Sequence, residues 1–197
     1  MVLSLVYFAA FTSIFFVFSL TWQSGFGRSA IVSGLAISPF ALGSMLAASN
    51  SNRLMQRLGR KLLIIGILLV IGGLTAVSMI FHWNSGAFSP WLTALPLFIS
   101  GLGSGLIISP LNSFTLATVP GADRGGASGI FNTAQRIGSS FGIAFVGSVY
   151  FHTLHKSTAG GGAAAFSSSL QMSIYVNLVL LLLCLGLVFR LPKETRS

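Results

Sequence analysis

The sequence predicts an all-α membrane protein, with six transmembrane helices in a three-plus-three bundle. Its 197 residues are 53% hydrophobic and only 7% charged, and the mean hydropathy is +0.88. So few polar residues cannot coat a soluble globule of this length. Six windows reach the roughly 20 apolar residues that a spanning helix needs. They cover 1–22, 29–49, 61–82, 91–113, 125–151 and 169–190, so we expect one transmembrane domain.

The charges follow the predicted helices. The formal net charge of +9 would suit a nucleic-acid partner, but the cations lie in short gaps between apolar runs, so we expect no nucleic acid. Six spans place both ends of the chain on one side. That side receives Arg53, Arg57, Arg60, Lys61, Arg124, Arg190, Lys193 and Arg196, and the opposite side receives Arg28 and Lys156. This asymmetry predicts cytoplasmic termini and a bacterial-type cytoplasmic membrane.

Tryptophan and cysteine agree with this class. Trp22, Trp83 and Trp91 fall at span ends on the predicted outer side, where we expect indole rings at the headgroup level. The single Cys184 lies in an apolar run and has no second thiol, which excludes a disulfide or a cysteine-based metal site within the chain. We predict no metal site and no cofactor other than a proton gradient if transport is coupled.

The six spans differ in polarity. The third and sixth are almost wholly apolar, whereas the first, second, fourth and fifth include serine, threonine, asparagine, glutamine and small residues. A helix that is apolar all round suits lipid, and a mixed one suits the interior. The two most apolar spans hold equivalent places in a three-plus-three division, which indicates an internal inverted repeat of the kind common in secondary transporters.

The fifth window carries Arg136 near its middle. On a helical wheel, Ile130 and Phe141 lie on one arc, and Asn132, Arg136 and Ser140 lie on the opposite side. A charge at mid-membrane costs about 2.5 to 3.5 kcal/mol, so Arg136 must face protein, water or an anion. Both a substrate or carboxylate contact and a structural bond to helix carbonyls fit this position. Further candidate cavity residues are Asn132, Thr133, Gln135, Asn112, Tyr7 and Phe11.

Glycine and proline predict close packing and bending. Three GxxxG pairs permit backbone approach: Gly101 with Gly105, Gly125 with Gly129, and Gly138 with Gly142. Pro110 interrupts the glycine-rich fourth span, which should be the most deformable. We expect residues 152–169, rich in glycine and alanine, to form an outer loop.

The loop between the second and third spans carries a recognisable motif. It reads Asn52-Arg53-Leu-Met-Gln56-Arg57-Leu-Gly59-Arg60-Lys61. It resembles the loop motif of the major facilitator superfamily, which is Gly, three residues, Asp, Arg, any residue, Gly, Arg, Lys. Arg57, Gly59, Arg60 and Lys61 match, but Asn52 replaces the family's glycine and Gln56 its aspartate. The missing aspartate removes a charge partner for any gating salt bridge here.

A second resemblance covers nearly the whole chain. The runs from Gly101 to Leu111, Val119 to Pro120 and Gly126 to Gly138 are similar to the fourth and fifth helices of the C-terminal half in the fourteen-span drug/proton antiporter branch. The stretch from Trp22 to Phe40 is similar to the start of that half. The resemblance implies half of a rocker-switch permease that exports drugs or amphipathic small molecules. It also implies that spans one, two, four and five line the pathway while three and six face lipid.

The acidic residues limit what this segment could do by itself. The only two are Asp123 and Glu194, both between or beyond the spans, so no span carries a carboxylate that could move a proton. The chain starts directly in an apolar span, without the charged region of a signal peptide. We therefore expect an N-terminal half as partner, together with the lipid bilayer and a small-molecule substrate.

Two other classes remain open. A free-standing six-span protein could act as a channel-like dimer or as a structural partner. An intramembrane serine protease is the enzyme alternative, because Gly126-Ala-Ser128-Gly129 resembles the GxSG of rhomboid proteases. The sixth span holds no histidine, and His82, His152 and His155 lie at span ends or in the outer loop. We therefore predict that the chain is not an enzyme.

Overall fold

The computed structural model describes residues 2–83, 90–117, 124–157 and 162–190, and this part of the chain is almost entirely helical. The helices are α1 (Val2–Leu20), the π-helical turn η1 (Thr21–Gly25) that continues it, α2 (Ala30–Leu58), α3 (Arg60–Trp83), α4 (Pro90–Ala117), α5 (Arg124–Ser157) and α6 (Ala163–Arg190). Within the described residues six helices are long and apolar enough to cross a membrane. The predicted fold class is confirmed.

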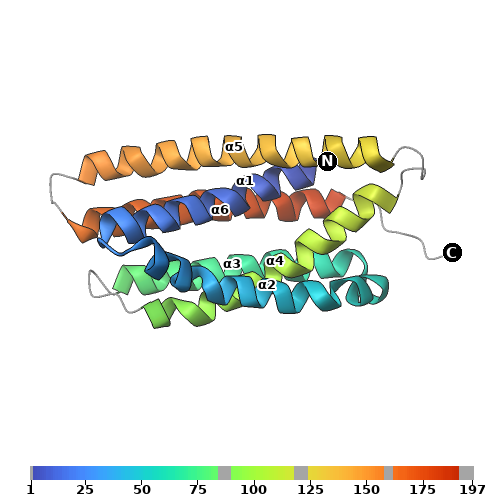
Figure 1. Ribbon diagram of the computed structural model, residues 1–197, viewed down its shortest axis with the longest axis horizontal. Helices are drawn as coiled ribbons and strands as arrows, with labels where there is room; N and C mark the ends of the chain where they lie inside the picture. Colours follow the sequence, from blue (N-terminus) through green and yellow to red (C-terminus); the bar gives the residue numbers. More distant parts are fainter. Residues whose placement is uncertain (1, 84–89, 118–123, 158–161, 191–197) are drawn as a thin grey trace.

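The helices form two groups of three (Figure 1). In one, α1 packs against α5 and α6; in the other, α4 packs against α2 and α3. The groups meet chiefly where α3 packs on α6. The packing is the same in both halves of the sequence when α1 is matched with α4, α2 with α5 and α3 with α6. Under this match the pairs α1–α5 and α1–α6 correspond to α4–α2 and α4–α3, and α3–α6 corresponds to itself. The packing therefore has the three-plus-three symmetry of an internal repeat.

Glycines allow the closest helix pairs to form. A Cβ added at Gly138 or Gly142 of α5 would overlap the carbonyl oxygens of Leu5 and Ala9 of α1. On the other group, a Cβ at Gly101 or Gly105 of α4 would overlap the backbone of α2. The two glycines of each pair are four residues apart and share one face of their helix. The neighbouring backbone can therefore approach that face, whereas a larger side chain would hold it away.

The ends of the bundle differ in charge. The α2–α3 junction, with Arg53, Arg57, Arg60 and Lys61, lies at the same end as the start of α1 and the end of α6 (Figure 1). The other end of the bundle has Arg28, which follows η1, and Lys156, which lies in the last turn of α5. The charge asymmetry expected from the sequence is therefore present in space.

Two connections are shorter than predicted. α2 continues through Leu58, so most of the basic loop motif is helical, and Gly59 alone separates it from α3. Its backbone has φ +51° and ψ −131°, a conformation that residues with a Cβ rarely adopt. The prediction of a loop over 152–169 was wrong at both ends, because α5 runs to Ser157 and α6 begins at Ala163; residues 158–161 lie outside the described residues. Alanines 163 to 165 are strong helix formers, and this preference outweighs the flexibility suggested by the preceding glycines.

The three tryptophans differ in their exposure. Trp83 and Trp91 are 81% and 83% exposed at their helix ends, as expected for rings at a membrane interface. Trp22 is instead fully buried in η1, where its ring lies 6.0 Å from that of Phe18 and 5.6 Å from that of Phe26. Its indole ring is enclosed by the protein and not exposed at a helix end, so the prediction of an interfacial Trp22 was wrong.

Candidate functional site

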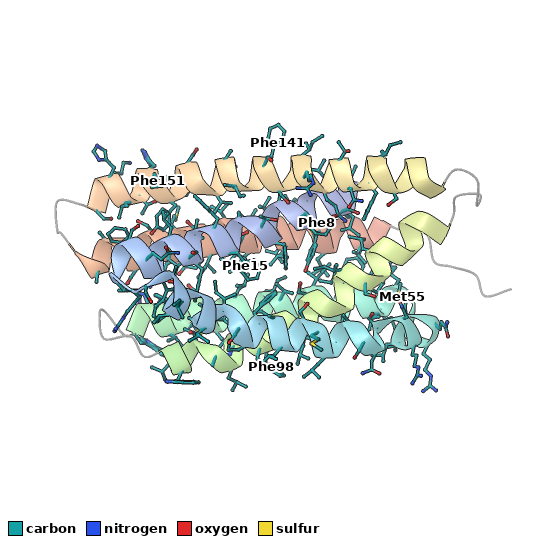
Figure 2. All side chains as sticks on the ribbon, viewed as in Figure 1. Phe8, Phe15, Met55, Phe98, Phe141 and Phe151 are labelled. Carbon is teal, nitrogen blue, oxygen red and sulfur yellow. The ribbon has the colours of Figure 1, made fainter. Side chains whose placement is uncertain are left out.

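α5 presents three faces rather than the two that its sequence predicted. A buried seam against α1 and α6 consists of Phe131, Gly138, Gly142, Val146 and Tyr150. An exposed apolar face consists of Ile130, Ile137, Phe141 and Phe145. An exposed polar face consists of Asn132, Thr133, Arg136 and Ser140. Figure 2 shows Phe141 pointing away from the bundle. The helical wheel did not reveal this packing seam, because two of its members are glycines and have no apolar side chain.

Arg136 projects from the polar face without a charged neighbour. Its side chain is exposed, and among the described residues it has no hydrogen-bond or ion-pair partner. Because α5 continues to Ser157, Arg136 lies about 18 Å from the N-terminal end of the helix, roughly a third of its length. A cation at this depth cannot face acyl chains without a large cost. The polar face is therefore the part of α5 that needs water, protein or a bound anion beside it.

The other polar candidates of α5 near this arginine differ in their exposure. Thr133 is exposed, and its hydroxyl donates to the Gly129 carbonyl at 2.9 Å. Asn132 is exposed beside it, whereas Gln135 is half-buried. Within the described residues a Cβ at Gly125 or Gly129 would meet nothing within 4 Å, unlike one at Gly138 or Gly142. The side chain of Asn112 on α4 lies outside the described residues.

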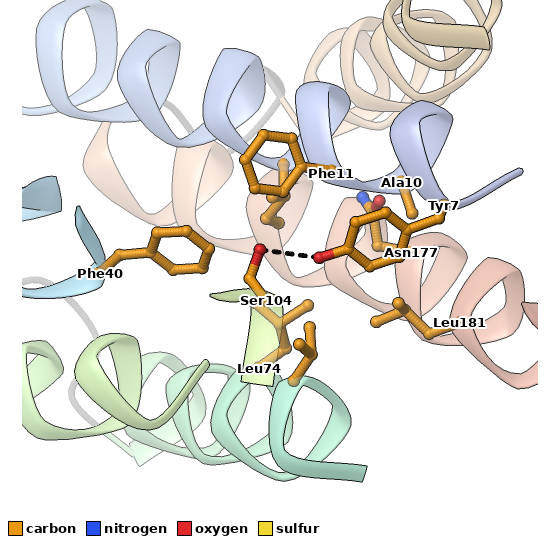
Figure 3. A pocket seen from close by; sticks show the side chains of 10 residues that line it. Tyr7, Ala10, Phe11, Phe40, Leu74, Ser104, Asn177 and Leu181 are labelled. Atoms are coloured by element: carbon orange, nitrogen blue, oxygen red, sulfur yellow. Dashed lines mark hydrogen bonds between the residues drawn. The ribbon is translucent and has the colours of Figure 1, made fainter. Parts of the chain in front are cut away.

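Tyr7 and Phe11 belong to a different site, a cavity between the two helix groups (Figure 3). Its lining residues are Tyr7, Ala10, Phe11, Ile14, Phe40, Val70, Leu74, Ser104, Asn177 and Leu181. The ring of Phe11 stacks on that of Tyr7 at 6.0 Å and lies 5.9 Å from that of Phe40 on α2. A row of α1 aromatic rings thus reaches α2 across the junction of the groups.

Buried hydrogen bonds tie α1 to three other helices. The Tyr7 and Ser104 hydroxyls are 2.7 Å apart, which joins α1 to α4 beside the cavity (Figure 3). The Ser13 hydroxyl donates to Asn177 Oδ1 of α6 at 3.0 Å, and Asn177 Nδ2 donates to the Ser173 carbonyl at 2.9 Å. Thr12 pairs with Ser139 of α5 at 2.9 Å. These polar side chains therefore find partners on neighbouring helices, as polar groups within a bundle of spanning helices commonly do.

The structure separates residues that the sequence grouped together. Tyr7 is 1% exposed and bonded to Ser104, so it is a buried contact between helix groups and does not lie on the surface with Arg136. Sequence reasoning missed Ser104 and Asn177. The signal for Asn177 was present, because a single amide directly before the apolar run of the sixth span must find a partner inside the bundle.

The loop-motif residues lie at the α2–α3 end. Arg53, Arg57 and Lys61 are exposed, and the Arg60 guanidinium lies 5.4 Å above the ring of Phe189 on α6. Pro110 is buried in α4, which continues as a helix through it and runs toward α5 (Figure 1).

No arrangement of catalytic or metal-binding side chains occurs in the described residues. Ser128 lies near the start of α5, whereas His152 lies near its end, about 36 Å away by helical rise. His82 ends α3 at the same end of the bundle as His152 (Figure 1). The described part of the chain also contains no group of three His, Cys, Asp or Glu side chains that could hold a metal ion. The serine–histidine pair of a protease is therefore not assembled here.

Six apolar helices, a three-plus-three packing pattern and a polar helix face within a span define the class: a helical bundle of the secondary-transporter type. Residues 1–197 match the family model described as Major Facilitator Superfamily, and the chain belongs to that family. Its members are transporters rather than enzymes, and the chain is a multi-pass membrane protein.

Several curated relatives are similar to parts of this chain. A triacylglyceride transporter of Mycolicibacterium smegmatis is 34% identical over 66% of this chain and 25% of its own length. A tetracycline resistance determinant of Streptomyces rimosus is 34% identical over 64% of the chain and 35% of its own length. A multidrug resistance protein of Mycobacterium tuberculosis is 30% identical over 62% of the chain and 22% of its own length. The chain thus spans about a third or less of these relatives.

Proposed function

We propose that this bundle is one half of a permease that exports drugs or other amphipathic small molecules from the cytoplasm. The observation that carries the proposal is the exposed polar face of α5, which brings Arg136 into a membrane span of a major facilitator chain. The names of the relatives support the substrate class, since they include a multidrug resistance protein and a tetracycline resistance determinant.

In this proposal the polar face of α5 borders the transport pathway. Arg136 contacts an anionic group of the substrate or a carboxylate of a second, N-terminal helical half. Asn132 and Thr133 supply hydrogen bonds beside it, and both are exposed on the same face. The residues that line the Tyr7 cavity hold the two helix groups together and set the shape of the pathway wall.

Proton coupling requires groups from elsewhere. Neither of the two acidic residues of the sequence, Asp123 and Glu194, falls within a predicted span, and both lie outside the described residues. We therefore place the proton-carrying carboxylates in the second half, as in a proton antiporter of the fourteen-span type. The cationic α2–α3 end faces the cytoplasm in this scheme, because positively charged loops favour that side.

The test is transport by an Arg136→Ala variant of the full-length permease. Efflux of an anionic amphipathic dye from preloaded cells should fall at least tenfold with the amount of protein in the membrane unchanged, because a pathway contact is lost while the packing seam is intact. Arg136→Lys keeps the charge and should retain part of the activity. Lys156→Ala is the control, since it removes an exposed cation from the other end of α5. Wild-type efflux in Arg136→Ala would contradict the proposed role.

A further inference from the structure

The strongest concentration of charge in the described residues lies at the α2–α3 junction. Arg53, Arg57, Arg60 and Lys61 fall within nine residues, and the sequence from 50 to 65 contains no acidic residue that could neutralise them. Three of the four side chains are exposed. Both helices end or begin here with only Gly59 between them, so the four cations are confined to one corner of the bundle (Figure 1).

Exposed apolar stripes lead to this corner along both helices. On α3, Lys61 stands at the head of a stripe formed by Ile65, Leu68 and Met79, which are 42%, 51% and 55% exposed. Lys61, Ile65 and Leu68 follow one another at intervals of four and three residues, and Met79 lies 11 residues, about three turns, beyond Leu68, so they share one face. On α2, Arg53 and Arg57 continue the exposed face of Leu42 and Leu46 in the same way.

A third element completes the corner. Phe189 near the end of α6 is 58% exposed, and the Arg60 guanidinium lies over its ring. This contact fixes the direction of one cation and places an exposed aromatic ring beside the start of α3. The corner therefore combines several cations at a helix end with apolar surface that continues toward the middle of the bundle.

We propose that this corner binds the headgroup of an anionic phospholipid. Arg57 and Lys61 contact the phosphate, Arg53 and Arg60 flank it, and the acyl chains lie along the Ile65–Leu68 stripe. The complementarity is twofold: the headgroup supplies negative charge, of which residues 50–65 contain none, and the chains cover apolar side chains next to it. Clustered basic residues at the end of a spanning helix attract anionic lipid in this manner.

The experiment uses the purified protein in detergent and measures the binding of phosphatidylglycerol and phosphatidylcholine by native mass spectrometry. The test variant is Arg57→Gln/Lys61→Gln. Its matched control is Arg28→Gln/Lys156→Gln, which removes the same net charge from exposed cations at the other end. Arg57→Lys/Lys61→Arg keeps both charges and shows whether the corner tolerates substitution. Glycerol phosphate is added as a competitor without acyl chains.

We expect the wild type to prefer phosphatidylglycerol. The test variant should bind it about 25-fold more weakly, since each of the two basic residues contributes about a fivefold attraction near a membrane surface. The control and the charge-conserving variant should bind as the wild type does, and glycerol phosphate should not displace the lipid. An equal loss of phosphatidylglycerol binding in the test and control variants would mean that binding depends only on the net charge of the protein. Displacement by glycerol phosphate would make the corner an anion site rather than a lipid site. Either result, or equal binding of the two lipids by the wild type, overturns the proposal.

Discussion

At the scale of single residues, burial decides which polar side chains hold the bundle together and which remain for function. Asn177 is completely buried and bonded on both sides, whereas Arg136, on another helix, is exposed without a partner in the described residues. A polar group in an apolar surrounding needs a partner. Asn177 has its partners on α1 and α6, whereas Arg136 has none among the described residues.

The Ser13–Asn177 bond can be measured by a double-mutant cycle. Asn177→Leu leaves the buried Ser13 hydroxyl without this acceptor and should lower the free energy of unfolding by about 1 kcal/mol. Adding Ser13→Ala to that variant should cost less than Ser13→Ala costs alone. Unfolding in mixed micelles, followed by circular dichroism, gives the four values. Strict additivity would mean that the bond contributes nothing to stability.

Residue identity alone could not separate these roles. The sequence put Tyr7 and Arg136 into one candidate cavity because both are functional groups within spans. In the structure, Tyr7 is bonded to Ser104, ninety-seven residues away in sequence. Such a pairing depends on how α1 crosses α4, and neither helix carries a sequence signal for that crossing. The candidate roles of Arg136, Asn132 and Thr133 stay predictions, although the structure puts all three on one exposed face.

At the scale of elements, the apolar spans were predictable, whereas GxxxG spacing marked three candidate packing faces and could not say which of them meet a neighbouring helix. Hydropathy located six helices, but it could not find the glycine seam of α5 or the continuation of α5 and α6 beyond the predicted ends. Glycines at Gly125 and Gly129 have the same spacing as those at Gly138 and Gly142. Only the second pair meets a neighbouring backbone in the described residues, because only it faces α1.

The two glycine pairs therefore make a matched test on one helix. Gly142→Ala should destabilise the bundle by about 1 to 3 kcal/mol, because its Cβ would overlap the Ala9 carbonyl and push α1 from α5. Gly129→Ala should be neutral or stabilising by up to about 1 kcal/mol, since alanine is the better helix former and the space is open. Thermal unfolding in detergent compares them. Equal melting temperatures would show that α1 and α5 do not approach as closely as described.

At the scale of the whole molecule, the fold follows from composition and repeat, whereas the function depends on which surfaces stay uncovered. The three-plus-three division was visible in the placement of the two most apolar spans, and the helix packing has the same symmetry. The helix pair α3–α6 joins the two groups, and the polar face of α5 remains exposed. Sequence reasoning could not establish this exposure, because it depends on which sides of α5 are covered by α1 and α6.

The central claim is that the polar face of α5 borders a water-filled pathway while its apolar face meets lipid. Cysteine accessibility tests it most directly. In a Cys184→Ala background of the full-length protein in membranes, single cysteines replace Arg136, Ile137, Ser140 or Phe141, which form two pairs of neighbours at nearly equal depth. A membrane-impermeant thiosulfonate should label Arg136→Cys and Ser140→Cys at least tenfold faster than Ile137→Cys and Phe141→Cys. Equal labelling within each pair, or faster labelling at Ile137 and Phe141, would contradict the claim.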